Sequence, residues 1–368
     1  MESSIENQEY PWYAGNSRLL DPSVSGRWLA AHILQAAIIM FWVGLDTLSE
    51  LQVFDPSLPM YEQGLVLIPH MAAEGIGVSS GGMVTSTFPY LAIAYVHWVA
   101  SLVLLFGGYY HLAVGPSDLS RGGRGNTKNF AFDWDDPKQL GYILGNHLLF
   151  IGFASLLFAG WMINHGIYDP TVGDVQAVTP TLENFAHIYQ YGWSTPGFNP
   201  FFIDNLGDLA AGHILIGIFD IVGGLWHINV APFRWDQQLG ARQDIYSPDG
   251  LIGLSLGGVA IMGFISAYFC AVNTFVYPVE FYGAALDVKF NLTPYFKDSV
   301  ELADGVYSSR AWLSNVTYYL AFYCLQGHLF HSLRAMGVKF ENLPQALANA
   351  FKVESSQPPM EGTQPTGE

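Results

Sequence analysis

The stretch from Leu209 to Ile228 reads LAAGHILIGIFDIVGGLWHI and decides the fold class of this 368-residue chain. Its length and apolar character are those of an α-helix that crosses the hydrocarbon core of a bilayer. It carries a single acid, Asp220, and two histidines, His213 and His227, spaced 14 residues apart. Such a stretch predicts a membrane-spanning helix that holds polar rings at two depths.

Charge is scarce throughout the chain and falls between apolar stretches. Only 12% of the residues are charged, 14 Lys and Arg against 31 Asp and Glu, whereas soluble domains have roughly 25%. Hydrophobic residues make up 51%. This composition excludes a soluble globular enzyme, a disordered acidic tail protein and a nucleic-acid binder. We expect an all-α integral membrane protein with six transmembrane helices, at about residues 27–48, 88–113, 140–165, 207–231, 250–277 and 311–336.

The basic residues indicate which side of the membrane holds the termini. Six spans place both ends on one side, and that side carries 11 Lys and Arg residues against 3 on the other. The positive-inside rule therefore predicts that both termini are cytoplasmic. We expect residues 1–26 to form a cytoplasmic segment without a cleavable signal, 27–339 the membrane domain, and 340–368 a polar, partly disordered tail. The similar strings GGYYH (107–111) and GGLWH (223–227) indicate three pseudo-symmetric helix pairs.

Histidines occur in both halves of these spans. A spacing of 14 residues, as between His97 and His111, is about 21 Å of helix rise and nearly a whole number of turns. A polar ring at such a depth needs a partner, and a single one is more often hydrogen-bonded to a neighbouring helix than a ligand. Many at matched depths, without matching carboxylates, indicate axial ligands to metallated macrocycles in two layers, one per leaflet. The histidines at span positions are His32, His97, His111, His147, His165, His213, His227, His328 and His331.

The type of macrocycle is open at this point. A neutral imidazole suits both haem iron and the magnesium of chlorophyll. A cytochrome b-type electron carrier with bis-histidine haems needs only four histidines on two helices, which leaves those of three other spans unexplained. It stays the alternative, together with a histidine-lined transporter. No nucleophile–base constellation or phosphate loop is evident, so we expect no enzymatic activity.

Several strings, in this order along the chain, carry a resemblance to a known family. They are PMYEQG (59–64), IPH (68–70), TFPY (87–90), GGYYH (107–111), GHI (212–214), GGLWHI (223–228), YPVEFYG (277–283) and GHLFH (327–331). Over roughly residues 10–340 the chain resembles the six-helix chlorophyll-binding antenna family of cyanobacteria. That family includes the smaller core antenna of photosystem II, the iron-stress-induced antenna and the Pcb antennas.

The resemblance implies a light-harvesting antenna of the thylakoid membrane that transfers excitation energy to a photosystem, with a photoprotective quenching role as an open question. It implies bound chlorophyll of undetermined type, carotenoid and lipid. The implied partners are a photosystem core, photosystem I slightly ahead of II, and copies of the protein in an arc or ring, without nucleic acid. The implied axial ligands of chlorophyll magnesium are His32, His97, His111, His147, His213, His227, His328 and His331, with Gln35 as a further pigment-binding residue.

This chain departs from the family pattern at several positions. The segment 283–310 is too short for the large lumenal domain of the photosystem II core antenna, so we expect a peripheral antenna. Gln35 and Thr317 stand where the family often has histidine. A Gln can ligate magnesium through its carbonyl, whereas Thr317 is not expected to do so without a water. His187 has no family role, and the part played by His70 and His165 in pigment binding is open.

Two further residue types need an interpretation. Cys270 and Cys324 fall inside spans and are expected to be buried small residues. The string CAVNT (270–274) is similar to the iron-stress branch, and a redox-controlled quenching role for Cys270 is the competing hypothesis. Asp220 lies seven residues from both His213 and His227, near mid-membrane. We predict that it is neutral, hydrogen-bonded either to a pigment carbonyl or to a neighbouring helix.

Overall fold

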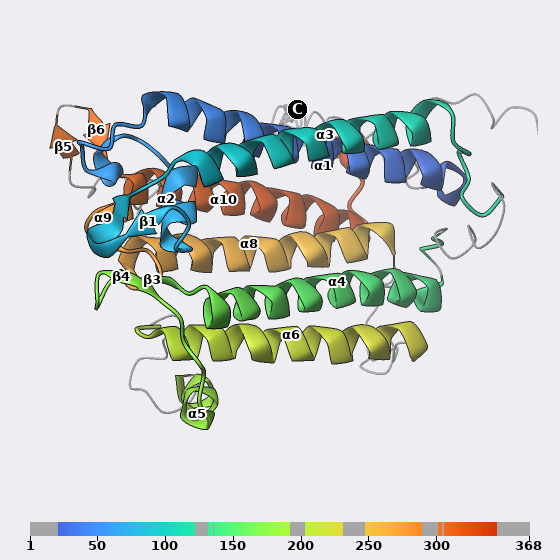
Figure 1. Cartoon of the computed structure of the whole chain (residues 1–368). Coiled ribbons are helices and arrows are strands. Elements are labelled where there is room, and N and C mark those ends of the chain that lie inside the picture. The colour runs from blue at the N-terminus through green and yellow to red at the C-terminus, as the bar shows by residue number, and fades with distance from the viewer. Residues whose placement is uncertain are drawn as a thin grey trace, which may run out of the picture.

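A computed structural model describes residues 21–121, 132–134, 136–191, 203–230, 247–288, 301–303 and 305–343. Six long helices lie side by side in this part of the chain, and their axes run roughly parallel or antiparallel to one another (Figure 1). They are α1 (Ser25–Val53), α3 (Phe88–Ala113), α4 (Pro137–Asn164), α6 (Leu206–Asn229), α8 (Pro248–Val272) and α10 (Ser309–Ala335).

Most of the short elements, all except η2 (Pro22–Val24) and η6 (Phe340–Asn342), gather at one end of the bundle, which we call the hairpin end (Figure 1). There α2 (Leu67–Ala73) and α9 (Val279–Tyr282) lie among three antiparallel two-stranded hairpins. The opposite end, here the terminal end, holds the start of α1 and the end of α10. The hairpins are β1 (Val78–Ser79) with β2 (Met83–Val84), β3 (Ile167–Asp169) with β4 (Asp174–Gln176), and β5 (Glu301–Ala303) with β6 (Val306–Tyr307). The other short elements are α5 (Leu182–Tyr191), η3 (Met60–Glu62) and η4 (Ser80–Gly82).

Hydropathy confirms the predicted fold class. Within the described residues, α1, α3, α4, α6 and α8 are long and apolar enough to cross a membrane. The sixth predicted span, α10, has 27 residues but is less apolar, because its first half carries Ser309, Arg310, Ser314 and Asn315. All four side chains are buried in the protein. The polar groups of α10 therefore face its neighbours, which leaves its outer surface for lipid or pigment.

Some helix ends differ from the predicted spans. The fifth span was expected to reach residue 277, but α8 ends at Val272. The reason is Asn273, whose side-chain oxygen accepts hydrogen bonds from the N–H groups of Phe275 (3.0 Å) and Val276 (2.8 Å) and so turns the chain. Conversely, α1 continues past residue 48 to Val53. Residues 1–20 and 344–368, which include most of both predicted terminal segments, lie outside the described residues.

The long helices form three antiparallel pairs, α1 with α3, α4 with α6, and α8 with α10. Each pair meets along a seam of small buried residues that recur every seven positions, the period of left-handed helix crossings. Contacts between the pairs come mainly from the short elements. The seam residues are Ala30, Ala37 and Gly44; Ala94, Ser101 and Gly108; Gly145, Gly152 and Ala159; Ala210, Gly217 and Gly224; Gly253, Ala260 and Ala267; and Ser314 and Ala321.

Two buried charged side chains stabilise the hairpin end. Arg310 is fully buried and donates hydrogen bonds to the carbonyls of Cys270, Asn273, Tyr277 and Gly283, at 2.5–3.0 Å. These bonds join the end of α8, the segment around α9 and the start of α10. In the same region the Glu50 carboxylate accepts hydrogen bonds from the backbone N–H groups of residues 66–68 at 2.6–3.1 Å, which ties the start of α2 to α1.

Candidate functional site: histidines along the helices

The eight histidines predicted as ligands lie at two levels of the bundle, as expected, but the levels are unequally filled. Because α1, α4 and α8 run toward the hairpin end and α3, α6 and α10 run away from it, the position of each residue along its helix gives its level (Figure 1). Two histidines, His97 and His213, lie in the half nearer the hairpin end. Six lie in the half nearer the terminal end: His32, His111, His147, His227, His328 and His331.

Helix geometry fixes the tautomer of three of these imidazoles. The Nδ1–H groups of His32, His97 and His213 each donate to the carbonyl four residues earlier, at 2.8, 2.8 and 2.9 Å. A carbonyl can only accept, so Nδ1 carries the proton and the lone pair is on Nε2. Metal-ligating histidines are commonly held in this way, with the second ring nitrogen bonded to a carbonyl or carboxylate.

In the α8–α10 pair, two histidines of α10 donate their Nδ1–H groups to acceptors on α8, across the helix interface. His328 donates from Nδ1 to the Gly253 carbonyl at 2.7 Å, and His331 donates to the Asp249 carboxylate at 2.8 Å. His328 stands where the small-residue seam continues on α10, and Gly257 of α8 makes room for it: a Cβ there would lie 2.6 Å from His328 Nδ1. The role of Asp249 could not be predicted from the sequence, because no spacing rule connects it with His331.

The other three predicted ligands have free ring nitrogens in the described part of the chain. Nδ1 of His111 is buried without a hydrogen-bond partner there. His147 and His227 likewise have no hydrogen bond among the described residues. No hydrogen bond from the described residues sets the orientation of these three rings.

All eight residues are at least partly exposed at the surface of the helix pairs, and His328 among them lies at the α8–α10 interface. His32 and His147 are exposed and the other six are half-buried. In each of α1, α3, α4, α6 and α8, less than a third of the most apolar 18-residue stretch is buried. Large apolar side chains such as Phe106, Phe150 and Phe219 are exposed on the outside. This surface suits a flat apolar macrocycle.

The side chains that could ligate a metal also fit a metallated macrocycle. No cluster of three or more His, Cys, Asp or Glu able to hold a bare metal ion occurs in the described residues. Single imidazoles with a free Nε2 match a metal that already has four ligands from a macrocycle and lacks one axial ligand. Chlorophyll, when bound, would supply the light absorption, and these histidines would hold its magnesium.

The two positions at which the family often has histidine are also on these surfaces. Gln35 is exposed on α1, three residues after His32. Thr317 is half-buried on α10, and its hydroxyl donates to the Leu313 carbonyl at 2.8 Å. Relative to the seam, Thr317 is equivalent to His97 and His213, since each lies three residues after a seam position. The spacing of 14 residues between Thr317 and His331, the same as between His97 and His111, indicates this equivalence from the sequence alone.

The positions three residues after each seam residue form a line along the helix, which we call its stripe; on α6 they are His213, Asp220 and His227. Asp220 is half-buried and has no hydrogen-bond partner among the described residues, so the predicted bond to a neighbouring helix is not seen there. The equivalent residue of α3 is Leu104 and that of α10 is Cys324. Cys324 is half-buried on this outer stripe, so the expectation that it is buried was wrong. Cys270 is 1% exposed at the α8–α10 interface, as expected of a packed small residue.

The histidines outside the predicted ligand set all lie near the hairpin end. His70 is on α2, and its Nδ1–H donates to the Val66 carbonyl at 2.7 Å. His165 is the exposed C-cap residue of α4 and stacks on Trp161, with ring centroids 3.9 Å apart. His187 of α5 is 3.6 Å from both Glu183 and Asp208, which makes it part of an ionic cluster.

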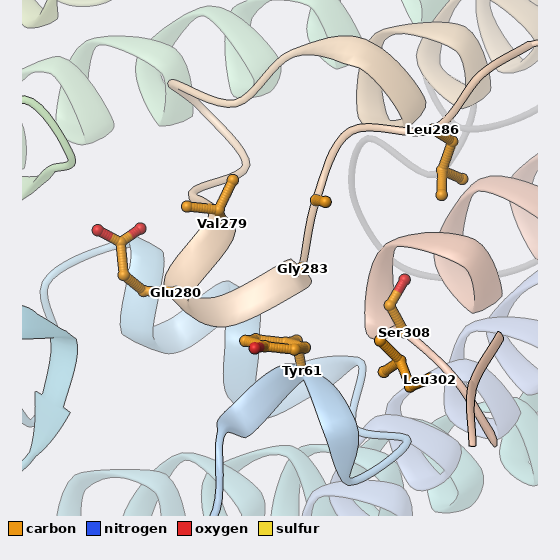
Figure 2. A pocket seen from close by; sticks show the side chains of 8 residues that line it. Tyr61, Val279, Glu280, Gly283, Leu286, Leu302 and Ser308 are labelled. Carbon is orange, nitrogen blue, oxygen red and sulfur yellow. The ribbon is translucent and has the colours of Figure 1, made fainter. Parts of the chain in front are cut away.

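A cavity of about 570 Å³ also opens at the hairpin end, between η3, α9 and the start of α10 (Figure 2). Tyr61, Val279, Gly283, Leu286 and Ser308 line it, together with Ala284, Leu302 and Glu280. No residue of the predicted ligand set is among them. The candidate site is therefore the set of outer helix surfaces and not this cavity.

Fold and histidines together define a class: a helical membrane protein whose single imidazoles can each supply one axial ligand to a metallated macrocycle. Residues 8–302 match the family described as "Photosystem II protein". The chain is 52% identical over 343 residues to the chlorophyll a/b light-harvesting protein PcbB of Prochlorothrix hollandica, covering 93% of this chain and 97% of the relative. PcbA of the same organism is 51% identical over 342 residues, with the same coverage. A divinyl chlorophyll a/b light-harvesting protein PcbB of Prochlorococcus marinus (strain MIT 9313) is 40% identical over 344 residues, 94% of this chain and 96% of the relative.

These matches span nearly the whole chain. The chain therefore belongs to the photosystem II protein family, together with the Pcb proteins, as the resemblance of its sequence strings implied.

Proposed function

We propose that this protein is a light-harvesting antenna that binds chlorophyll and carotenoid and transfers excitation energy to a photosystem. The observation that carries the proposal is the set of partly exposed imidazoles along the apolar helices whose Nδ1–H donates to a protein acceptor while Nε2 has no hydrogen-bond partner among the described residues. The names of the relatives specify chlorophyll and light harvesting. They give no support to the haem-binding alternative.

In this proposal each histidine acts as one axial ligand of chlorophyll magnesium. The ligands are His32, His97, His111, His147, His213, His227, His328 and His331, with Gln35 as a further ligand through its side-chain carbonyl. Carotenoids and lipid would pack against the exposed aromatic and aliphatic side chains between the helix pairs. The protein itself performs no chemistry and is not an enzyme; its helices hold pigments at fixed separations.

The apolar helices and the family support a multi-pass protein of the thylakoid membrane. The excess of Lys and Arg on the side of the termini supports a cytoplasmic terminal end and a lumenal hairpin end. The short segment 283–310 leaves no room for a large lumenal domain, which supports a peripheral antenna. Its partners would be a photosystem core, photosystem I slightly favoured over II, and copies of itself in an arc or ring.

Pigment analysis tests the proposal. The protein purified from thylakoid membranes should release several chlorophylls and carotenoid into acetone, and His213→Leu should release one chlorophyll fewer per polypeptide. His187→Gln is the matched control, because His187 is occupied by Glu183 and Asp208 and should leave the chlorophyll count unchanged. An extract that contains haem, or no pigment, contradicts the proposed function.

A further inference from the structure

The hairpin end has fewer predicted ligands than the terminal end. Only His97 and His213 lie in that half. We propose that His70, on the short helix α2, is a further axial ligand of a chlorophyll magnesium at the hairpin end. This inference rests on the proposed chlorophyll-binding function.

The ring nitrogens of His70 are arranged as in the predicted ligands. Nδ1 donates to the Val66 carbonyl, four residues earlier, at 2.7 Å, the same bond that holds His32, His97 and His213. The lone pair is therefore on Nε2. That atom has no hydrogen-bond partner in the described part of the chain, and the residue is half-buried. A half-enclosed imidazole with one free nitrogen needs a partner, and a magnesium would provide one.

The His70 ring is held on two sides by aromatic residues from a distant part of the sequence. Its centroid lies 6.4 Å from that of Tyr277 and 5.6 Å from that of Tyr282, and both contacts are edge-on, at 89° and 83°. Burial lowers the pKa of His70, which favours the neutral ring that a ligand requires. The ring is thus oriented without any pigment.

The backbone that carries His70 is equally constrained. Glu50 of α1 accepts the N–H groups of Val66, Leu67 and Ile68, which fixes the first turn of α2. Arg310 bonds the carbonyls of Tyr277 and Gly283, which fixes the segment that holds the two tyrosines. A ligand on such a support keeps its direction when a pigment binds, as a metal ligand should.

The test compares pigment counts of variants purified from thylakoid membranes. His70→Phe fills the space between the tyrosines without offering a ligand and should contain one chlorophyll fewer per polypeptide than the unsubstituted protein. His187→Phe is the control for loss of a histidine near the same end and should keep the full number. A His70→Phe protein with the full chlorophyll number overturns the inference.

A second measurement keeps the test decisive if His70→Phe fails to accumulate. A density map of the native pigmented protein by electron cryomicroscopy should show a macrocycle whose magnesium is bonded to His70 Nε2. A map with chlorophyll on His97 and His213 but none on His70 overturns this inference and leaves the proposed function intact. Absence of chlorophyll from the native protein defeats the proposed function itself.

Discussion

The close packing of α4 on α6 gives a sharp test of how the helix pairs are held. A Cβ added at Gly145 would lie 2.5 Å from the Gly224 carbonyl oxygen and 2.7 Å from Ile228 Cγ1. Real Cβ contacts are at least 3.0 Å, so Gly145→Ala must move the backbone of α6 away by about half an ångström. Forcing apart a packed interface costs about 1–3 kcal/mol.

The same helix offers a control that cancels the change in helix propensity. Gly160 of α4 has nothing within 4 Å of an added Cβ, and both substitutions improve helix propensity by about 1 kcal/mol. Unfolding in mixed detergent micelles with increasing SDS, followed by far-ultraviolet circular dichroism, should therefore find Gly145→Ala about 1–3 kcal/mol less stable than Gly160→Ala. Equal free energies of unfolding for the two variants would refute the conclusion that direct backbone contact holds the pair.

Three further predictions concern the hairpin end and the ligand stripes. Arg310→Met leaves several buried carbonyls without a donor and should lower the free energy of unfolding by at least about 3 kcal/mol in the same assay; a loss below 1 kcal/mol would contradict this. Asp220→Leu removes the polar side chain midway between the proposed ligands His213 and His227 and should shift the chlorophyll absorption maximum, whereas Asp220→Asn keeps a hydrogen-bonding side chain there and should shift it less. Normal assembly with an unchanged spectrum in Asp220→Leu rules out the tuning role. Thr317→His places an imidazole at the position equivalent to His97 and His213 and should add one chlorophyll per polypeptide, measured by acetone extraction; an unchanged count contradicts the equivalence.

The sequence predicted the six long helices because hydropathy is a local property that each span carries alone. It did not predict the hairpin end, whose stability comes from contacts between residues far apart. Glu50 bonds backbone groups 16–18 positions away, and Arg310 bonds carbonyls 27–40 positions away. Neither residue has a neighbour in the sequence that indicates its partner. A buried Arg that bonds only carbonyls has no charge pairing that a pattern could reveal.

For the site, the sequence predicted which residues are candidate ligands, but it did not predict all of the hydrogen bonds that orient their rings. The spacing of 14 residues predicted that His97 and His111 share one face of a helix, and likewise His213 and His227. The reason is that 14 residues are close to four whole turns of an α-helix. Nδ1 bonds to the carbonyl four residues earlier follow from helix geometry and could also have been predicted. The partners of His328 and His331 depend on how α8 lies against α10, which no single-helix rule supplies.

The end of the bundle with few predicted ligands is also the end at which short elements join the helix pairs, and we infer that the two features have one cause. Energy transfer depends on fixed pigment separations, so the helix pairs must not slide or splay when pigment occupies the surfaces between them. At the terminal end, the pigments proposed to bind six of the histidines would fill the space between the pairs. At the hairpin end, α2, α9 and the hairpins pack between the helix pairs. Hydrogen bonds of Glu50 and Arg310 join α2 and the α9 segment to the long helices. On this reasoning the hairpin end should keep its structure in pigment-free protein, whereas the terminal end should loosen. Hydrogen exchange of the pigment-depleted protein should find slow amides in α2 and α9 and faster exchange near His227 and His331, and uniform exchange along the helices would contradict this division.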